Sequence, residues 1–259
     1  MSVTPQECRV TILVKALPQP SKRYGETVCC AGVTPDGRWK RLYPIRFRHL
    51  SGKSSFKRWD QVRFRYSTPR QDKREESCHV HEDSVEIFGE LSRKERSRAF
   101  DPLVLPSVAE AARRGHSLAL IRPIEPRFLW KRKSDAAMAE EREAYAKAAR
   151  QGSLLDKELA TLEPTPYEFK FRFRDEEADH TYVNGDWEAH AMFYNGIRNG
   201  KSEAEVLGWM DQTFNVEYPS KGMAFAVGNQ AKRPQTWQLL GVLRLDELSE
   251  AEKAQGRLF

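Results

Sequence analysis

The chain of 259 residues contains no run of 18 apolar residues, the length that a membrane-spanning helix needs. Its amino terminus lacks the charged start and apolar stretch of a secretory signal, so we expect a cytoplasmic protein with no membrane partner. Only four cysteines are present and none forms a CxxC pair, which favours reduced thiols packed as small hydrophobic groups. The group Cys78-His79-x-His81 holds zinc-binding side chain types, and with Cys29 or Cys30 a zinc site is the alternative interpretation.

Short motifs that identify common enzyme classes are also missing. There is no GxxxxGK[ST], GxGxxG or GxSxG motif, so P-loop, dinucleotide-binding and α/β-hydrolase functions lose their usual support. The absence of HExxH removes the zincin class, and the chain has no internal repeat. The sequence therefore identifies no reaction through a motif.

Charge is distributed unevenly along the chain. Residues 1–133 hold 28 Lys and Arg against 15 Asp and Glu, a net +13, whereas residues 134–259 hold 15 against 22, a net −7. The excess is strongest in residues 38–74, where 13 basic residues accompany only Asp60 and Asp72. Seven aromatic residues are interleaved there, and basic side chains among exposed rings are typical of nucleic-acid surfaces.

Periodicity in the first third of the chain predicts short strands. Residues 9–17 are rich in β-branched side chains, and residues 26–33 and 38–43 flank the turn Pro35-Asp36-Gly37, which predicts a hairpin. Residues 61–66 alternate apolar and polar side chains, and residues 79–88 add one or two strands. This spacing is typical of a small β-barrel or a strongly bent sheet.

The rest of the chain predicts helices and further strands. Ser107 is a good N-cap for a helix over 108–114, residues 135–150 favour a long helix, and Ser202 with Glu205 forms a capping box. Phenylalanine and tyrosine alternate with charged residues over 167–174, which predicts an amphipathic strand with a cationic outer face. Residues 223–227 and 236–243 are expected to be strands joined by a basic loop over 228–235.

These patterns predict an α+β fold, with an amino-terminal small β-barrel-like or bent-sheet module and a carboxyl-terminal mixed α/β module. We divide the chain into a basic, aromatic-rich β module (1–90), a helical connector with short strands (91–163) and a mixed α+β module (164–259).

The basic segment gives the first functional hypothesis, an accessory or regulatory factor in DNA or RNA processing. Its cations would contact phosphates and its rings would stack on bases. The predicted nucleic-acid-binding residues are Arg38, Trp39, Lys40, Arg41, Tyr43, Arg46, Arg48, Lys57, Arg58, Trp59, Arg63 and Arg65.

A carboxylate and histidine cluster over 175–190 gives the second hypothesis, a metal-dependent nuclease. Such cleavage needs carboxylates that converge on one or two cations, so Mg²⁺ or Mn²⁺ is expected only under this hypothesis; otherwise no cofactor is expected. The candidate catalytic residues are Asp175, Asp186, Glu188 and His190. The structural alternative is that Asp186 caps a helix and that the acidic residues stabilise its amino-terminal end. A third hypothesis is a protein-interaction module with a partner on the acidic carboxyl-terminal half.

Overall fold

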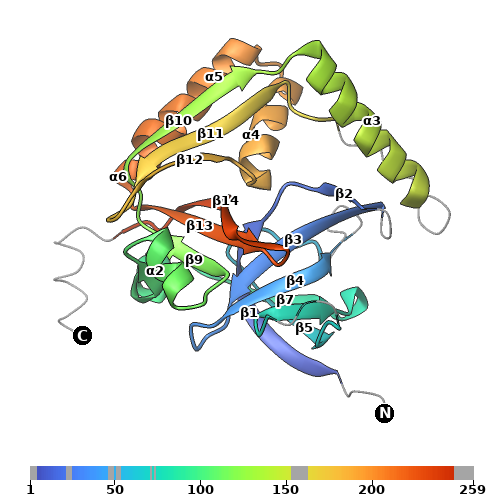
Figure 1. Cartoon of the computed structure of the whole chain (residues 1–259), viewed down its shortest axis with the longest axis vertical. Coiled ribbons are helices and arrows are strands. Elements are labelled where there is room, and N and C mark those ends of the chain that lie inside the picture. The colour runs from blue at the N-terminus through green and yellow to red at the C-terminus, as the bar shows by residue number, and fades with distance from the viewer. Residues whose placement is uncertain are drawn as a thin grey trace.

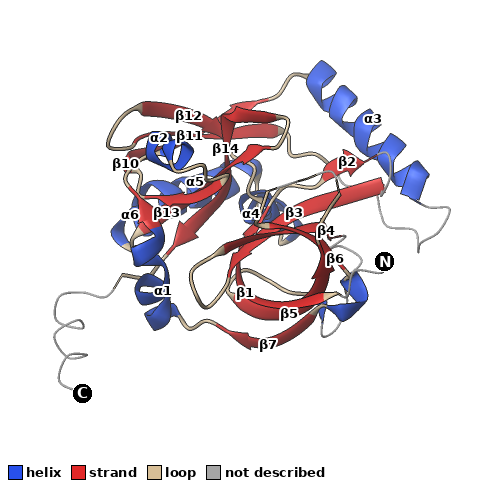
Figure 2. Ribbon diagram, turned by 60° about the horizontal axis from the view of Figure 1, so that its bottom comes forward, coloured by secondary structure: helices blue, strands red, loops and turns tan. Residues whose placement is uncertain are grey.

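The amino-terminal third of the protein contains a closed barrel, formed by strands between residues 6 and 80. The computed structural model describes residues 5–21, 25–45, 50, 54–70, 72, 74–152 and 163–247. The barrel strands, in the order in which they pair, are β1 (Gln6–Lys15), β3 (Gly25–Val33), β4 (Trp39–Ile45), β6 (Ser77–Val80) and β5 (Asp60–Ser67). β5 pairs again with β1, which closes the ring seen along its axis in Figure 2. β2 (Gln19–Ser21) extends β3, and β7 (Glu86–Glu90) pairs with β5 on the outside.

Alternating side chains explain why these segments form a barrel. Val62 and Phe64 of β5 point inward and are fully buried, while the residues between them face outward. The predicted hairpin at Pro35-Asp36-Gly37 joins β3 to β4, and Gly37 supplies the positive φ of 81° that the turn needs. A 3-10 helix, η2 (Glu82–Ser84), separates β6 from β7.

Residues 104–247, which we call the second half of the protein, contain two sheets whose strands pair mostly in antiparallel fashion. One has the order β14 (Arg233–Arg244), β13 (Met223–Gln230), β9 (Leu118–Ile121) and β8 (Val104–Leu105). The other has the order β10 (Ile124–Arg132), β11 (Tyr167–Arg174) and β12 (Asp179–Val183). Strands from residues 104–132 therefore pair with strands from residues 167–230 in both sheets.

The helices begin where the sequence offers caps. They are α1 (Arg93–Phe100), η3 (Asp101–Leu103), α2 (Val108–Arg113), α3 (Asp135–Gly152), α4 (Trp187–Arg198), α5 (Glu203–Gln212), the π-helix η4 (Thr213–Glu217) and α6 (Tyr218–Ser220). Ser107 accepts a hydrogen bond from the Glu110 N–H, and Ser202 forms a capping box with Glu205. None of the helices in the described part of the chain is both long and apolar enough to cross a membrane.

Two sheets and the barrel form successive layers (Figure 1). One face of the β8–β9–β13–β14 sheet packs on the barrel through residues such as Leu13, Leu120 and Leu243. Its other face packs on the phenylalanine side of β11 and on α4 and α5. The opposite face of the β10–β11–β12 sheet carries polar, mainly exposed side chains. α3 leaves this sheet and packs against β2 and β3 of the barrel.

The α+β fold with its amino-terminal barrel-like module is confirmed. The expected loop over 228–235 is wrong, because β13 runs to Gln230 and β14 begins at Arg233, with Gln230 paired to Arg233 across a tight turn. The structure also adds β12, which falls in the acidic cluster over 175–190. The division at residues 90 and 163 stays a prediction.

Candidate nucleic-acid interface

Most of the predicted phosphate-binding cations on the barrel surface lie in ion pairs. The pairs are Arg38–Asp36 (2.6 Å), Lys57–Glu90 (2.9 Å), Arg63–Glu86 (2.8 Å) and Arg65–Asp83 (3.7 Å). Lys40 donates to the backbone carbonyl of Glu75 at 3.3 Å, and its ammonium lies 5.7 Å from the centre of the Tyr66 ring. Neighbouring carboxylates thus compensate much of the local positive charge.

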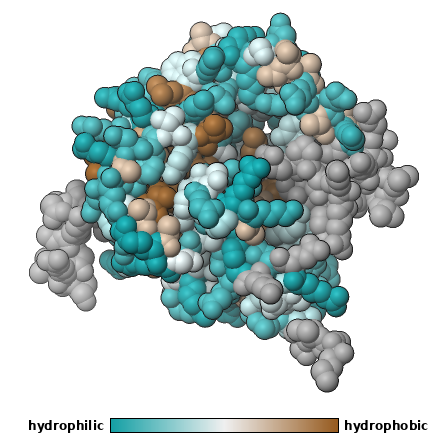
Figure 3. Space-filling view, in the orientation of Figure 1, coloured by the Kyte–Doolittle hydropathy of each residue, from teal (hydrophilic) through white to brown (hydrophobic). Residues whose placement is uncertain are grey.

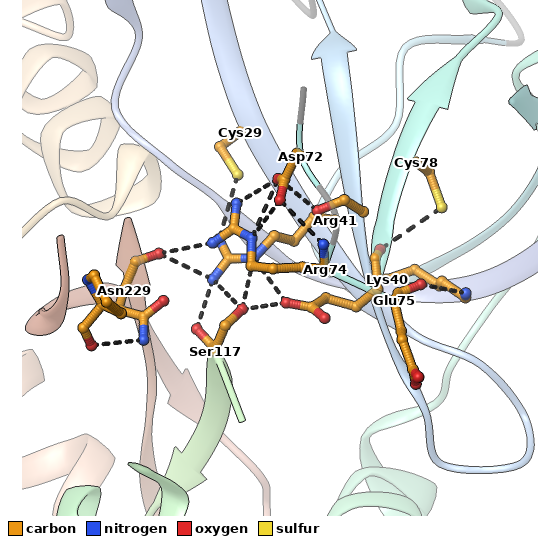
Figure 4. A network of polar contacts seen from close by, with 12 residues as sticks. Cys29, Lys40, Arg41, Asp72, Arg74, Glu75, Cys78, Ser117 and Asn229 are labelled. Atoms are coloured by element: carbon orange, nitrogen blue, oxygen red, sulfur yellow. Dashed lines mark hydrogen bonds and ion pairs between the residues drawn. The ribbon is translucent and has the colours of Figure 1, made fainter. Parts of the chain in front are cut away.

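Arg41 is buried between the barrel and the second half of the protein (Figure 4). Its Nη2 donates to the backbone carbonyls of Ser117 at 2.6 Å and Asn229 at 3.2 Å, and its Nη1 lies 3.9 Å from the Cys29 sulfur. Arg74 donates to the same Asn229 carbonyl at 3.2 Å. These contacts join β4 to the sheet that holds β9 and β13, so Arg41 does not face solvent.

The side chain of Arg58 is only 9% exposed, and it binds a residue from the second predicted site. Its Nη2 donates to the Asp186 carboxylate at 2.6 Å, and its other nitrogens donate to the carbonyls of Leu13 and Val242. Burial raises the pKa of Asp186, but the Arg58 guanidinium and the backbone N–H groups of Glu188 and Val242 oppose this shift. We take the pair as ionised at neutral pH, and it fastens α4 to the barrel.

The predicted stacking rings are mostly unavailable to bases. Trp59 is buried, with the guanidinium of Arg96 4.1 Å from its ring centre, and Trp39 is half-buried against the core. Tyr43 is 42% exposed. Arg46 and Arg48 lie outside the described residues.

The structure brings Asp186, Glu188 and His190 to the start of α4, where each has a local partner. Asp186 is the N-cap of the helix, and Glu188 lies 3.0 Å from the ammonium of buried Lys15. Burial lowers the pKa of His190 to about 4, and its Nδ1 lies 2.9 Å from the Thr165 hydroxyl. Asp186 and Glu188 thus hold the start of α4 against the barrel, and His190 packs against the segment that precedes β11.

Asp175 lies away from these residues, at the turn between β11 and β12. Its carboxylate accepts backbone hydrogen bonds from Val108, Glu177 and Ala178, and its Oδ2 lies 2.7 Å from His180 Nε2. Burial favours the protonated acid, but these hydrogen bonds outweigh it and lower the pKa of Asp175. Since β12 separates Asp175 from Asp186, the four predicted catalytic residues do not converge.

Metal-binding side chains do not gather elsewhere in the described ranges either. No group of three or more His, Cys, Asp or Glu residues within them is placed to hold a metal ion. The zinc alternative is included in this statement, because Cys29, Cys30, Cys78, His79 and His81 are all described.

The exposed face of the β10–β11–β12 sheet, which we call the arginine face, presents a different cationic surface. It consists of Arg127, Leu129 and Lys131 from β10, Glu168, Lys170, Arg172 and Arg174 from β11, and Asp179, Thr181 and Val183 from β12. The five cations outnumber the two carboxylates, and α4 and α5 lie behind the sheet in Figure 1. Figure 3, in the same orientation, shows mainly hydrophilic residues with isolated hydrophobic ones over this part.

The arginines of this face lie side by side and are exposed. Arg127 of β10 is the register partner of Arg172 of β11, and Arg174 follows on the same face. Within the described part of the chain, no carboxylate lies within 4 Å of any of these three guanidinium groups, whereas Lys170 pairs with Glu168 at 2.7 Å. Positive charge without a carboxylate partner is therefore concentrated on β10 and β11.

A hollow of about 640 Å³ opens at one end of the arginine face. The three arginines line it together with Asp179 and His180. A β-bulge between Ile124 and Arg127 shapes its wall. The three guanidinium groups can reach an anion there from two strands.

The sequence contained a signal for part of this surface. Alternation over 167–174 predicts the cationic outer side of β11, but nothing local predicts that β10 places Arg127 beside Arg172. β12 is harder to recognise, because this edge strand has only five residues and both of its sides are partly exposed.

The fold and this surface define an α+β protein that joins a closed five-stranded barrel to a layered pair of sheets with an exposed cationic face. The chain belongs to the family described as "Domain of unknown function (DUF8757)", whose model matches residues 104–259. A second family model, "Domain of unknown function (DUF8758)", matches residues 6–106, which include the barrel. A search of curated proteins found no match.

Proposed function

We propose that this protein is a nucleic-acid-binding accessory factor in DNA or RNA processing, and that it binds through the arginine face. The observation that carries the proposal is the exposed set of Arg127, Arg172 and Arg174, which has no carboxylate partner among the described residues. The ion-paired cations of the barrel support binding less well, because phosphates would have to compete with carboxylates already in place.

The chemistry of the face suits phosphate. A guanidinium group presents a planar fork of donors that can bind two phosphate oxygens at once. The sheet beneath it is rigid, because Phe169, Phe171 and Phe173 of β11 anchor its other side in the core. Arginines on such a rigid sheet need little rearrangement of the backbone beneath them to bind a ligand.

A metal-dependent nuclease requires carboxylates that converge on a cation, and the candidate carboxylates lie apart, so they do not support the alternative function. Asp186 and Asp175 serve as acceptors for backbone N–H groups at separate places. A protein partner on the acidic carboxyl-terminal half stays a prediction.

The test measures the salt dependence of binding. Fluorescence anisotropy of a labelled single strand of about 20 nucleotides gives the affinity of the wild type and of Arg127→Gln/Arg172→Gln/Arg174→Gln over a series of salt concentrations. Because each neutralised phosphate of a single strand contributes about 0.7 to the slope of log K against log salt, three lost contacts should reduce the slope by about 2. Wild-type affinity should fall steeply as salt rises.

A matched control separates site from total charge. Lys57→Gln/Arg63→Gln/Arg65→Gln removes the same charge from ion-paired positions on the barrel. It should change the slope by much less. An equal reduction of the salt slope in the two variants would contradict binding at the arginine face. Absence of wild-type binding at low salt would overturn the proposed function.

A further inference from the structure

The arginine face has a shape that suits a single strand of nucleic acid, an inference that rests on the proposed function. Lys170, Arg172 and Arg174 alternate along β11 on the exposed side, so neighbouring cations are about 7 Å apart in a single row. A row of this kind follows one sugar–phosphate backbone. The two backbones of a duplex diverge across its grooves, so only one of them could follow it.

The width of the sheet is unsuited to reading a duplex. The major groove, about 12 Å wide, admits a helix or a two-stranded ribbon. Three strands already span about 10 Å between the outer strand axes, before any side chain is added. The layer behind the sheet adds thickness to this width. The arginine face can therefore lie against a duplex but cannot enter its groove.

Exposed apolar side chains lie beside the cationic row. Leu129 and Val183 are the cross-strand partners of Lys170, one on each side, and they are 42% and 53% exposed. Apolar side chains at this position can contact the faces of unpaired bases, which a duplex keeps stacked inside.

We propose that the arginine face selects single-stranded nucleic acid. The strand lies along β11, with its phosphates on the arginines and its bases against the apolar side chains on either side. Duplex contacts only the cations and is bound more weakly.

The test compares one labelled strand of about 20 nucleotides, alone and annealed to its complement, by anisotropy at the same salt concentration. The full-length wild type should bind the single strand at least about tenfold more tightly, because only unpaired bases offer faces for contact. Leu129→Thr/Val183→Thr places threonine, a residue with high strand propensity, at both positions and removes apolar surface. It should weaken single-strand binding about threefold or more, with an unchanged salt slope and unchanged duplex binding.

Phe88→Thr/Ile197→Thr is the control, since it removes two exposed apolar side chains from β7 and α4. It should bind both probes as the wild type does. Duplex binding as tight as single-strand binding would overturn the inference and leave the proposed function standing, as would wild-type affinity of the Leu129→Thr/Val183→Thr variant. Absence of binding to both probes would overturn the proposed function and this inference with it.

Discussion

The buried imidazole of His190 should make the stability of the protein depend on pH. The ring is 6% exposed, and its Nε2–H donates to the backbone carbonyl of Asn184 at 3.2 Å. Burial, assisted by the charge of Lys133, lowers its pKa to about 4, although the Asn184 hydrogen bond acts in the opposite direction. An unfolded chain would protonate the same histidine at a pKa of about 6.5.

The direction of the effect follows from these two pKa values. Because the folded pKa lies below the unfolded one, His190 adds its full contribution above pH 6.5 and loses it as the pH falls toward 4. For a single group, the loss of unfolding free energy between pH 7.5 and pH 5 is about 2 kcal/mol. A change of this size is a large part of the stability of an ordinary domain.

The assay is urea unfolding, followed by tryptophan fluorescence, at pH 7.5, 6 and 5. His190→Gln can keep a donor near the Asn184 carbonyl but cannot titrate, so its unfolding free energy should fall by about 2 kcal/mol less than that of the wild type over this range. His116→Gln, at an exposed position, should reproduce the wild-type loss. The reasoning is refuted if the difference between wild type and His190→Gln stays constant from pH 7.5 to pH 5.

Two further substitutions test the packing that positions the arginine face. Arg58→Met should destabilise the protein by about 3–5 kcal/mol, because it leaves the Asp186 carboxylate buried without its cation, and adding Asp186→Asn should recover part of this loss. Both are measured by urea unfolding, and a cost of the single variant below about 1 kcal/mol would contradict the ionised pair. Gly196→Ala should lower stability by about 1–3 kcal/mol despite the helix propensity of alanine, since its Cβ would lie 2.5 Å from a methyl carbon of Val206; an unchanged melting temperature would disprove this contact.

Local pattern was sufficient where an element carries both of its faces in its own sequence. β11 is predictable because buried rings alternate with charged residues over eight positions. The hairpin between β3 and β4 is predictable because Pro35-Asp36-Gly37 requires a turn. The sequence predicts both β13 and β14 but makes each strand too short. Glycine, proline and polar residues over 228–235 resemble a loop when their pairing partners are unknown.

The candidate site depended on pairing across long separations, which a local charge count does not contain. Arg63 is the register partner of Glu86 in the neighbouring strand, 23 residues further along the chain. A window that ends at residue 74 therefore counts the cations of the barrel without the acidic residues of η2 and β7 that neutralise them. In the same way, the carboxylates over 175–190 are close in sequence but lie at opposite ends of β12.

Charge also has a structural use at the boundary between the two family matches, which meet at residues 104–106. Arg58 and Arg41 belong to the first match, and their acceptors Asp186 and Ser117 belong to the second. Because a buried guanidinium group without its acceptors costs several kcal/mol, each half needs the other to satisfy these groups. The most basic segment of the chain thus contributes two of its arginines to holding the halves together. The charge left for a polyanion is the charge that remains unpaired after this assembly, and its clearest concentration is on β10 and β11.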